Sequence, residues 1–203
     1  MKPINFFPRF KNLNLESINV DFHLHSTWTD GKNTVSEIIN SAQNNQLNSI
    51  AITDHIRIES EYFDNYESEI KSLNSKTDLN IYLGFEAKIA DFNGNIDVKD
   101  NVVKRADIAI ASVHRFPLGS KLYKASEFKK NISQEIELEL SLAALNKGGF
   151  NVLGHAGGMS MTHFREFPSL YFEEIISKCC QNEIAFDLSG RYHIKVLSIL
   201  YPL

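Results

Sequence analysis

The sequence has few of the features of a secreted or membrane-bound protein. Its 203 residues include only two cysteines, Cys179 and Cys180, and because adjacent cysteines could form only a strained bridge, a disulfide framework is excluded. Residues 1–17 lack the apolar core of about 7 to 15 residues that a signal peptide requires, and no run approaches the roughly 20 apolar residues of a membrane span. We therefore expect a cytoplasmic protein that makes no membrane contact.

Positive charge is also in short supply. The formal net charge is −4 and the pI is near 6.0, and the basic residues form no long stripe, which favours small anionic substrates over long polymers. Lysines at 121, 124, 129 and 130 keep an oligonucleotide as an alternative, although an exposed loop and helix face explains them as well. With 43% hydrophobic residues the chain can bury one core, so we expect an extension at 1–17 and one domain over 18–203.

Short apolar runs alternate with segments of helical spacing. The runs predict strands at 18–22, 48–53, 80–85, 106–113, 150–153 and 184–188. The helical segments lie at 34–46, 62–75, 127–147 and 168–181, and a further helix is expected to begin near Tyr192. Thr34 and Glu37 form a capping-box pair, and Gly148-Gly149 is a typical helix end. This alternation predicts an α/β fold with a parallel sheet and helical crossovers.

Five of the seven histidines stand at the ends of these runs, together with one glutamate. They are His23, His25, His55, His114, His155 and Glu86. Side chains two residues apart in a strand point to the same face, so His23 and His25 would converge. Because the carboxyl ends of barrel strands face one rim, the other side chains would gather there too. The pattern predicts a polynuclear metal site, and its imidazole and carboxylate ligands suit Zn, Mn or Fe without selecting one.

The order of these motifs resembles the PHP (polymerase and histidinol phosphatase) superfamily. The motifs are Asp-Phe-His-Leu-His-Ser, Thr-Asp-His, Gly-Phe-Glu, Ser-Val-His and Gly-His, and the match runs from residue 20 to residue 191. A single His-x-His would be weak evidence, whereas five blocks in order are specific. The resemblance implies a distorted (β/α)7-type barrel with three metals on its rim and hydrolysis of phosphoesters. Its members include histidinol-phosphate phosphatases, nucleotide phosphodiesterases and exonuclease domains of bacterial DNA polymerases.

The resemblance also assigns metal ligands. It makes His23, His25 and Glu86 ligands of one metal, with Glu86 bridging to a second metal that is held by His114 and His155. A third metal would lie near His55 and Asp30. Asp54 is expected to orient a neighbouring ligand from outside the coordination shell. With two or three divalent metals bound, a metal-activated hydroxide would attack phosphorus in line.

The chain departs from the family pattern at its carboxyl end. Members of the superfamily finish with an Asp-x-His on the seventh strand, and no Asp-x-His follows Glu86 here. The barrel is therefore expected to lack its last βα unit. Three explanations stay open: a truncated chain, other ligands or a partner chain in place of the missing ones, or a domain that has lost its activity. His163 and His193 are spare histidines that could replace a lost ligand, although we favour their interpretation as a loop residue at the substrate rim and a helix-start residue.

Arginines near the predicted rim are candidate phosphate ligands, because a guanidinium can pair with two oxygens at once. Arg115 and Arg191 are the best placed, followed by Arg57, and a solvated surface charge is an equal alternative for each. Residues 116–120 and the loop at 157–167, which carries His163, are expected to fold over the rim and set substrate choice.

Three functions follow from this pattern. The first is a metal-dependent phosphoesterase that hydrolyses a small phosphomonoester, as histidinol phosphatases do. The second is a 3'-5' exonuclease or nucleotide phosphodiesterase. The third belongs to another class: an inactive, metal-stabilised module that associates with itself or with a partner through the open edge of the barrel.

Overall fold

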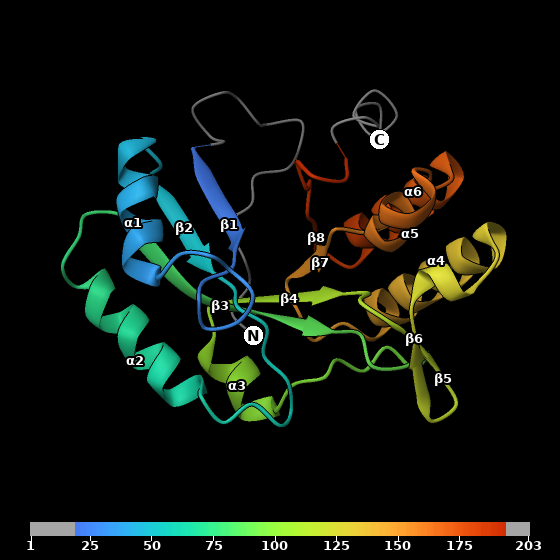
Figure 1. Cartoon of the computed structure of the whole chain (residues 1–203), viewed down its shortest axis with the longest axis horizontal. Coiled ribbons are helices and arrows are strands. Elements are labelled where there is room, and N and C mark those ends of the chain that lie inside the picture. Colours follow the sequence, from blue (N-terminus) through green and yellow to red (C-terminus); the bar gives the residue numbers. More distant parts are fainter. Residues whose placement is uncertain (1–18, 194–203) are drawn as a thin grey trace. The chain divides into compact units, whose positions relative to one another are not determined.

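The computed structural model describes residues 19–193 and contains a parallel sheet (Figure 1). In hydrogen-bonding order its strands are β1-β2-β3-β4-β7-β8, and helices separate most of them along the chain. The predicted α/β class with a parallel sheet is therefore confirmed. The proposed extension at 1–17 and the helix expected to follow Tyr192 lie outside the described residues, apart from a turn at 190–193. Contacts divide the described chain into two compact units, which are taken in turn.

The first unit comprises residues 19–86 and 98–109. Its strands are β1 (Val20–Leu24), β2 (Ser49–Ile52) and β3 (Asn80–Lys88, the last two residues belonging to the second unit). Its helices are α1 (Val35–Asn44), α2 (Phe63–Asn74) and α3 (Asp100–Arg105). The strands pair in parallel, with Val20 opposite Ser49 and Ile50 opposite Ile81. The carboxyl ends of all three strands therefore lie at the same edge of the sheet.

Helix α1 begins and packs as its sequence predicts. The Thr34 hydroxyl accepts a hydrogen bond from the backbone of Glu37, and the Glu37 carboxylate accepts one from the backbone of Thr34, so the capping box is complete. Val35, Ile39 and Ala42 recur at helical spacing and are buried. The burial of this apolar stripe and of the run at 50–52 in β2 contributes to the hydrophobic stabilisation of the unit.

Tyr66 of α2 forms hydrogen bonds with the backbone of both β2 and β3. Its hydroxyl lies 2.6 Å from the carbonyl of Ile52 and 3.0 Å from that of Gly84, and the backbone N–H of Asp54 donates to it at 3.3 Å. Burial raises the pKa of this phenol well above its usual range, so it stays protonated and donates to these carbonyls. The side chain therefore connects the end of β2 to the middle of β3.

The second unit comprises residues 87–97 and 110–193. Its sheet strands are β4 (Ile108–Ser112, which begins in the first unit), β7 (Val152–Gly154) and β8 (Ala185–Phe186), paired in parallel. A separate antiparallel hairpin is formed by β5 (Phe116–Leu118) and β6 (Lys121–Tyr123). The helices are the short 3-10 helix η2 (Ala125–Glu127), α4 (Lys130–Lys147), α5 (Gly158–Phe164) and α6 (Ser169–Gln181). In Figure 1, α4, α5 and α6 lie side by side in this unit.

The structure corrects several predicted elements. Residues 157–167 were expected to form a loop, but 158–164 form helix α5, and the segment at 116–120 is part of a β-hairpin. Helix α3 was not predicted at all, since six residues are too few to show a helical period. The strand at 80–85 extends to Lys88, so Glu86 lies inside β3 and not beyond its end.

The structure can be compared with the sequence-based expectations on membrane spans and on disulfides. Within residues 19–193, no helix combines the length and the apolar character needed to cross a lipid bilayer. Cys179 and Cys180 are both free, as their adjacency suggested. Burial raises the pKa of the Cys179 thiol to about 12, so this sulfur stays protonated and packs as an apolar atom.

Candidate metal centre

The predicted metal ligands of the first unit lie near the carboxyl ends of its strands. His23 lies in β1 and His25 directly follows it, His55 follows β2, and Glu86 is near the end of β3. Backbone pairing fixes their spacing: Thr53 donates to the carbonyl of Leu24 at 2.7 Å, and His55 forms a parallel bridge with Glu86. The parallel sheet thus brings together residues that are more than 60 positions apart in the sequence.

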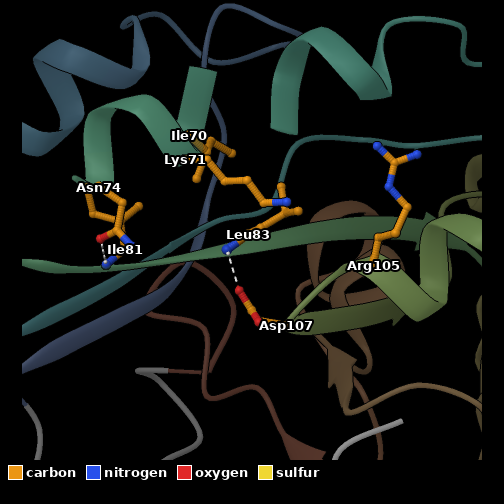
Figure 2. Close-up of a pocket in the computed structure, with 7 residues that line it drawn as sticks. All are labelled: Ile70, Lys71, Asn74, Ile81, Leu83, Arg105 and Asp107. Atoms are coloured by element: carbon orange, nitrogen blue, oxygen red, sulfur yellow. Dashed lines mark hydrogen bonds between the residues drawn. The ribbon is translucent and has the colours of Figure 1, made fainter. Parts of the chain in front are cut away.

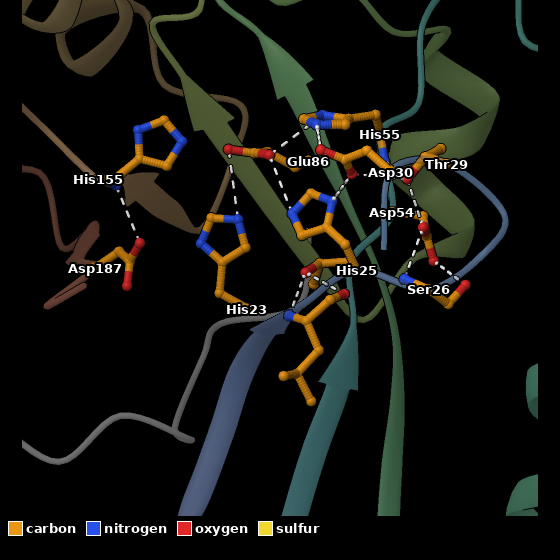
Figure 3. Close-up of polar contacts among 12 residues, drawn as sticks. His23, His25, Ser26, Thr29, Asp30, Asp54, His55, Glu86, His155 and Asp187 are labelled. Atoms are coloured by element: carbon orange, nitrogen blue, oxygen red, sulfur yellow. Dashed lines mark hydrogen bonds and ion pairs between the residues drawn. The ribbon is translucent and has the colours of Figure 1, made fainter. Parts of the chain in front are cut away.

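Glu86 is the centre of this cluster (Figure 3). Its side chain is 2% exposed, and its Oε1 lies 3.4 Å from Nε2 of His23. Its Oε2 lies 3.3 Å from Nε2 of His25 and 3.2 Å from Nδ1 of His55. A buried carboxylate is costly unless cations or hydrogen-bond donors surround it, and here three imidazoles supply the nitrogens.

Asp30 adds a second carboxylate to the cluster. Its Oδ1 lies 3.0 Å from Nδ1 of His25 and its Oδ2 lies 3.5 Å from Nε2 of His55. Desolvation alone would raise the pKa of Asp30, but the charges of His25 and His55 together with hydrogen bonds outweigh it, and the pKa lies below its ordinary value. Because 67% of the Asp30 side chain is exposed, water screens these interactions, so Asp30 is less constrained than Glu86.

The arrangement of nitrogens and oxygens fits a divalent metal. His25 faces a carboxylate oxygen with each of its ring nitrogens, yet a neutral imidazole carries only one N–H, so the other lone pair would face an anion. Moreover, the buried Nδ1 of His25 makes no hydrogen bond, although Oδ1 of Asp30 lies 3.0 Å from it. Ligand atoms of His23, His25 and Glu86 lie within 4.8 Å of one another, as do those of His25, Asp30 and His55. Both sets offer the nitrogen and oxygen donors that Zn, Mn and Fe accept.

Asp54 holds the loop that carries Asp30. It is fully buried and accepts hydrogen bonds from the backbone N–H of Ser26 at 3.0 Å, the Ser26 hydroxyl at 2.7 Å and the Thr29 hydroxyl at 2.6 Å. Its partners are therefore loop groups beside the histidines and not the imidazoles themselves. Ser26 and Thr29 were missed in the sequence because isolated hydroxyl residues carry no motif, although they flank the loop between two predicted ligands.

Two further features fix the backbone at His25 and His55. The Tyr62 hydroxyl donates to the carbonyl of His55, and the Tyr62 ring stacks on Trp28 with centroids 5.5 Å apart. A Cβ on Gly31 would lie 2.1 Å from the carbonyl oxygen of His25, so only glycine fits beside that ligand. The backbone carbonyls of His25 and His55 are thus held by close neighbours, which limits how far the two imidazoles can move.

The second unit contains the other two predicted metal ligands. His114 follows β4 and His155 follows β7, and their rings lie with centroids 5.3 Å apart. His155 has a left-handed backbone with φ of 29°, which is rare for a residue with a side chain. Its N–H donates to Oδ2 of Asp187 at 3.0 Å (Figure 3). Asp187 was not singled out in the sequence because it falls inside the predicted strand at 184–188, whereas the observed strand ends at Phe186.

The predicted phosphate-binding side chains are all exposed. Arg57 lies in the turn after His55, and Arg115 donates to the carbonyl of His114 at 2.9 Å. Arg191 lies over the ring of Tyr192, 5.3 Å from its centroid. His163 is exposed on α5, not on a loop. Their predicted role in binding substrate stays a prediction.

A pocket of about 340 Å³ lies elsewhere in the first unit (Figure 2). Its lining residues are Ile70, Lys71, Asn74, Ile81, Leu83, Arg105 and Asp107. The charges around it are already paired: Arg105 binds Asp64 and Glu67, Lys71 binds Glu67, and Asp107 accepts from the backbone of Leu83. Its lining contains no histidine, and we do not assign the metal chemistry to it.

Histidines and carboxylates at the carboxyl ends of parallel strands define an α/β domain with a candidate metal centre. The chain belongs to the PHP domain family, whose model matches residues 21–188. The resemblance inferred from the motifs is therefore confirmed.

Two curated relatives are similar over about half of the chain. The DNA polymerase/3'-5' exonuclease PolX of Bacillus subtilis is 32% identical over 110 residues, which cover 50% of this chain and 19% of the polymerase. A probable phosphatase of Caldicellulosiruptor bescii is 32% identical over 103 residues, covering 48% of this chain and 42% of the phosphatase. The matched region thus spans less than half the length of either relative.

Solved structures show the same fold. The histidinol phosphate phosphatase of Lactococcus lactis, complexed with zinc, L-histidinol and phosphate, superposes with a TM-score of 0.62 at 21% identity, covering 82% of this chain and 71% of that one. A histidinol phosphatase described as putative from Listeria monocytogenes has a TM-score of 0.57 at 16% identity, with coverage of 80% and 76%. At these identities the similarity shows the fold alone, and the reaction has to be argued from the residues of this chain.

Proposed function

We propose that the protein is a metal-dependent phosphoesterase that hydrolyses a small phosphomonoester. The observation that carries this proposal is the buried Glu86 carboxylate, which faces imidazole nitrogens of His23, His25 and His55 at 3.2 to 3.4 Å. When bound at such a cluster, divalent ions acidify coordinated water and neutralise the charge that develops on a phosphate in hydrolysis.

The side chains of this chain then have distinct roles. His23, His25 and Glu86 would hold one ion, and His25 or His55 with Asp30 would bind a further ion at the more exposed side of the cluster. His114 and His155 are proposed as additional ligands from the second unit. Asp54 keeps the loop of Asp30 in place through Ser26 and Thr29, and the exposed guanidinium groups of Arg57, Arg115 and Arg191 are candidates for phosphate binding.

The comparisons support a phosphate ester as substrate and favour a monoester. The probable phosphatase matches half of this chain, and the solved histidinol phosphate phosphatase holds zinc, L-histidinol and phosphate. The net charge of −4 also favours a small anion over a nucleic acid. Phosphodiester cleavage is the second candidate, because the polymerase and 3'-5' exonuclease of Bacillus subtilis matches at the same level of identity.

Hydrolysis of three substrates in parallel tests the proposal. Para-nitrophenyl phosphate, bis-para-nitrophenyl phosphate and 5'-labelled single-stranded DNA are incubated with protein loaded with Mn²⁺ or Zn²⁺. We expect turnover of the monoester to exceed that of the diester and of DNA, and to fall by at least about a hundredfold in His25→Ala. Glu67→Gln is the matched control, because Glu67 is a buried carboxylate whose partners, Arg105 and Lys71, lie outside the cluster.

The pattern of activity decides between the candidates. Preference for DNA or the diester would replace the phosphatase by a nuclease or phosphodiesterase. Protein that carries metal but leaves all three substrates intact would support the inactive, metal-stabilised module and would contradict the proposed reaction.

A further inference from the structure

Residues 155–157, which directly follow β7, adopt an unusual backbone conformation. His155 has φ of 29° and Gly157 has φ of 76°, two left-handed residues within three positions. A Cβ on Gly157 would lie 2.7 Å from the ring of Phe167, so the chain passes close to its neighbours there. A strained segment of this kind persists only where surrounding groups hold it, and each of the contacts that do so can be identified.

Glu137 of α4 binds the chain just after this segment, at Met159 and Ser160. Its side chain is inside the core, with 1% of the residue exposed, and Oε1 accepts a hydrogen bond from the N–H of Met159 at 2.9 Å. Oε2 accepts from the N–H of Ser160 at 2.9 Å and from the Ser160 hydroxyl at 2.6 Å. Burial of a carboxylate is unfavourable unless donors surround it, and these three donors all come from the segment or its immediate continuation.

His193 binds the segment itself, at the carbonyl of Ala156. It is fully buried, and its Nδ1 accepts a hydrogen bond from the N–H of Ser189 at 3.0 Å. A backbone N–H can only donate, so the Nδ1 carries the lone pair and the proton of the neutral ring is on Nε2. That Nε2–H points to the carbonyl of Ala156 at 2.9 Å and donates to it. The rings of Phe172 and Phe186 pack against the imidazole at centroid distances of 5.7 and 5.2 Å and fix its orientation.

We propose that His193 and Glu137 are positioning residues which hold the backbone after β7 so that the imidazole of His155 is presented in one orientation. His193 fixes the carbonyl next to His155, and Glu137 fixes the start of helix α5 a few residues later. The N–H of His155 itself is held by Asp187. This inference rests on the proposed function, because the orientation matters only if His155 is a metal ligand, and groups that orient a ligand typically contribute about 10- to 100-fold to metal affinity.

The sequence does not connect either position with His155, although His193 was noted as a spare histidine. In the sequence His193 is a histidine after Arg191-Tyr192, with no apolar run before it, and Glu137 is one of several acidic residues on a long helix. Both are more than 15 positions from His155, and only the packing of α4 and of the turn at 190–193 brings them to it.

Zinc titration of protein labelled with ¹⁵N in its histidine rings tests the proposal. The ring signals of each histidine are followed by NMR as zinc is added to metal-free wild type, His193→Phe, His193→Gln and Glu137→Gln. Phenylalanine keeps the bulk of a ring and removes both hydrogen bonds, whereas the glutamine amide can restore the donor to Ala156. Leu140→Ala, also fully buried on α4, is the control for a general loss of stability.

We expect the His155 signals of His193→Phe and Glu137→Gln to respond only at zinc concentrations at least about tenfold higher than in wild type. His23, His25 and His55 should respond as in wild type, and His193→Gln should restore much of the His155 response. If both variants behave like Leu140→Ala at His155, the two residues are structural and the proposal is wrong. If no histidine of the wild type responds to zinc, the proposed function fails first and this inference fails with it.

Discussion

At the scale of single residues, the account depends on Glu86 more than on any other side chain. Three imidazole nitrogens lie within 3.4 Å of its carboxylate oxygens, and the side chain is nearly inaccessible to water. Replacement by glutamine keeps the size and one acceptor oxygen but removes the charge that attracts a cation. We therefore expect Glu86→Gln to bind divalent metal at least tenfold more weakly and to lose most phosphoesterase activity, with metal content measured by mass spectrometry after dialysis.

Glu67→Gln is the control for that measurement, and it should keep the metal content of the wild type. The same metal loss in both variants would contradict the assignment of Glu86, since it would reflect a general effect of removing a buried carboxylate.

Glu67 also gives a prediction on pH. Hydrogen bonds from Arg105, and then from Lys71, outweigh desolvation and hold the pKa of Glu67 below its usual value of 4.5. A carboxyl group whose pKa is lower in the folded state stabilises the fold above the pKa of the unfolded chain, and this contribution disappears as the pH falls through the folded value. Because Lys71 and Arg105 are partly exposed, the contribution should be about 1 kcal/mol.

Urea unfolding of wild type and Glu67→Gln at several pH values measures this contribution. The variant should be less stable at pH 7, and the difference should shrink as the pH falls below the usual pKa of 4.5 and disappear once the pH is below the lowered pKa of the folded state. A difference that stays constant down to pH 3 would show that lost packing, and not the charge of Glu67, is responsible.

At the scale of elements, the pairing of β2 with β3 requires a glycine at position 84. A Cβ there would lie 2.6 Å from Cγ2 of Thr53 and close to the carbonyls of Ile108 and Ile52. We expect Gly84→Ala to lower the free energy of unfolding by about 1–3 kcal/mol, as overpacking of a buried site does.

The double variant Gly84→Ala with Thr53→Ser identifies the cause. Serine lacks the clashing methyl group but keeps the hydroxyl that contacts the backbone of Leu24 at 3.0 and 3.1 Å. The second substitution should recover part of the lost stability in denaturant unfolding, with a coupling of about 0.5 kcal/mol or more. Simple additivity of the two changes would refute the steric explanation.

At the scale of the whole molecule, a metal that binds only the folded chain must stabilise it. Saturation at 100 times the dissociation constant contributes about 2.7 kcal/mol, which corresponds to a rise in melting temperature of about 5–11 °C for a chain of this size. Calorimetry with zinc and then with excess EDTA measures this rise and its reversal. A melting temperature that is the same in both conditions would argue against a metal centre of useful affinity.

Much of this architecture could be predicted from the sequence, for physical reasons. Buried parallel strands are continuous apolar runs, so their order along the chain and their approximate positions were visible, and the histidines near their ends indicated the cluster. What could not be seen depends on contacts across the sequence. The role of Asp54 in holding Ser26 and Thr29, the short helix α5 around His163, and the anchoring of His155 by Asp187, Glu137 and His193 arise from packing between distant segments.

The central claim is that His23, His25 and Glu86 bind a divalent ion, and anomalous diffraction at the zinc absorption edge tests it most directly. In crystals of zinc-loaded protein we predict an anomalous peak at about 2.0–2.2 Å from Nε2 of His23, Nε2 of His25 and a carboxylate oxygen of Glu86. Zinc peaks that lie only at other residues, or no peak despite zinc in the crystal, would contradict the account.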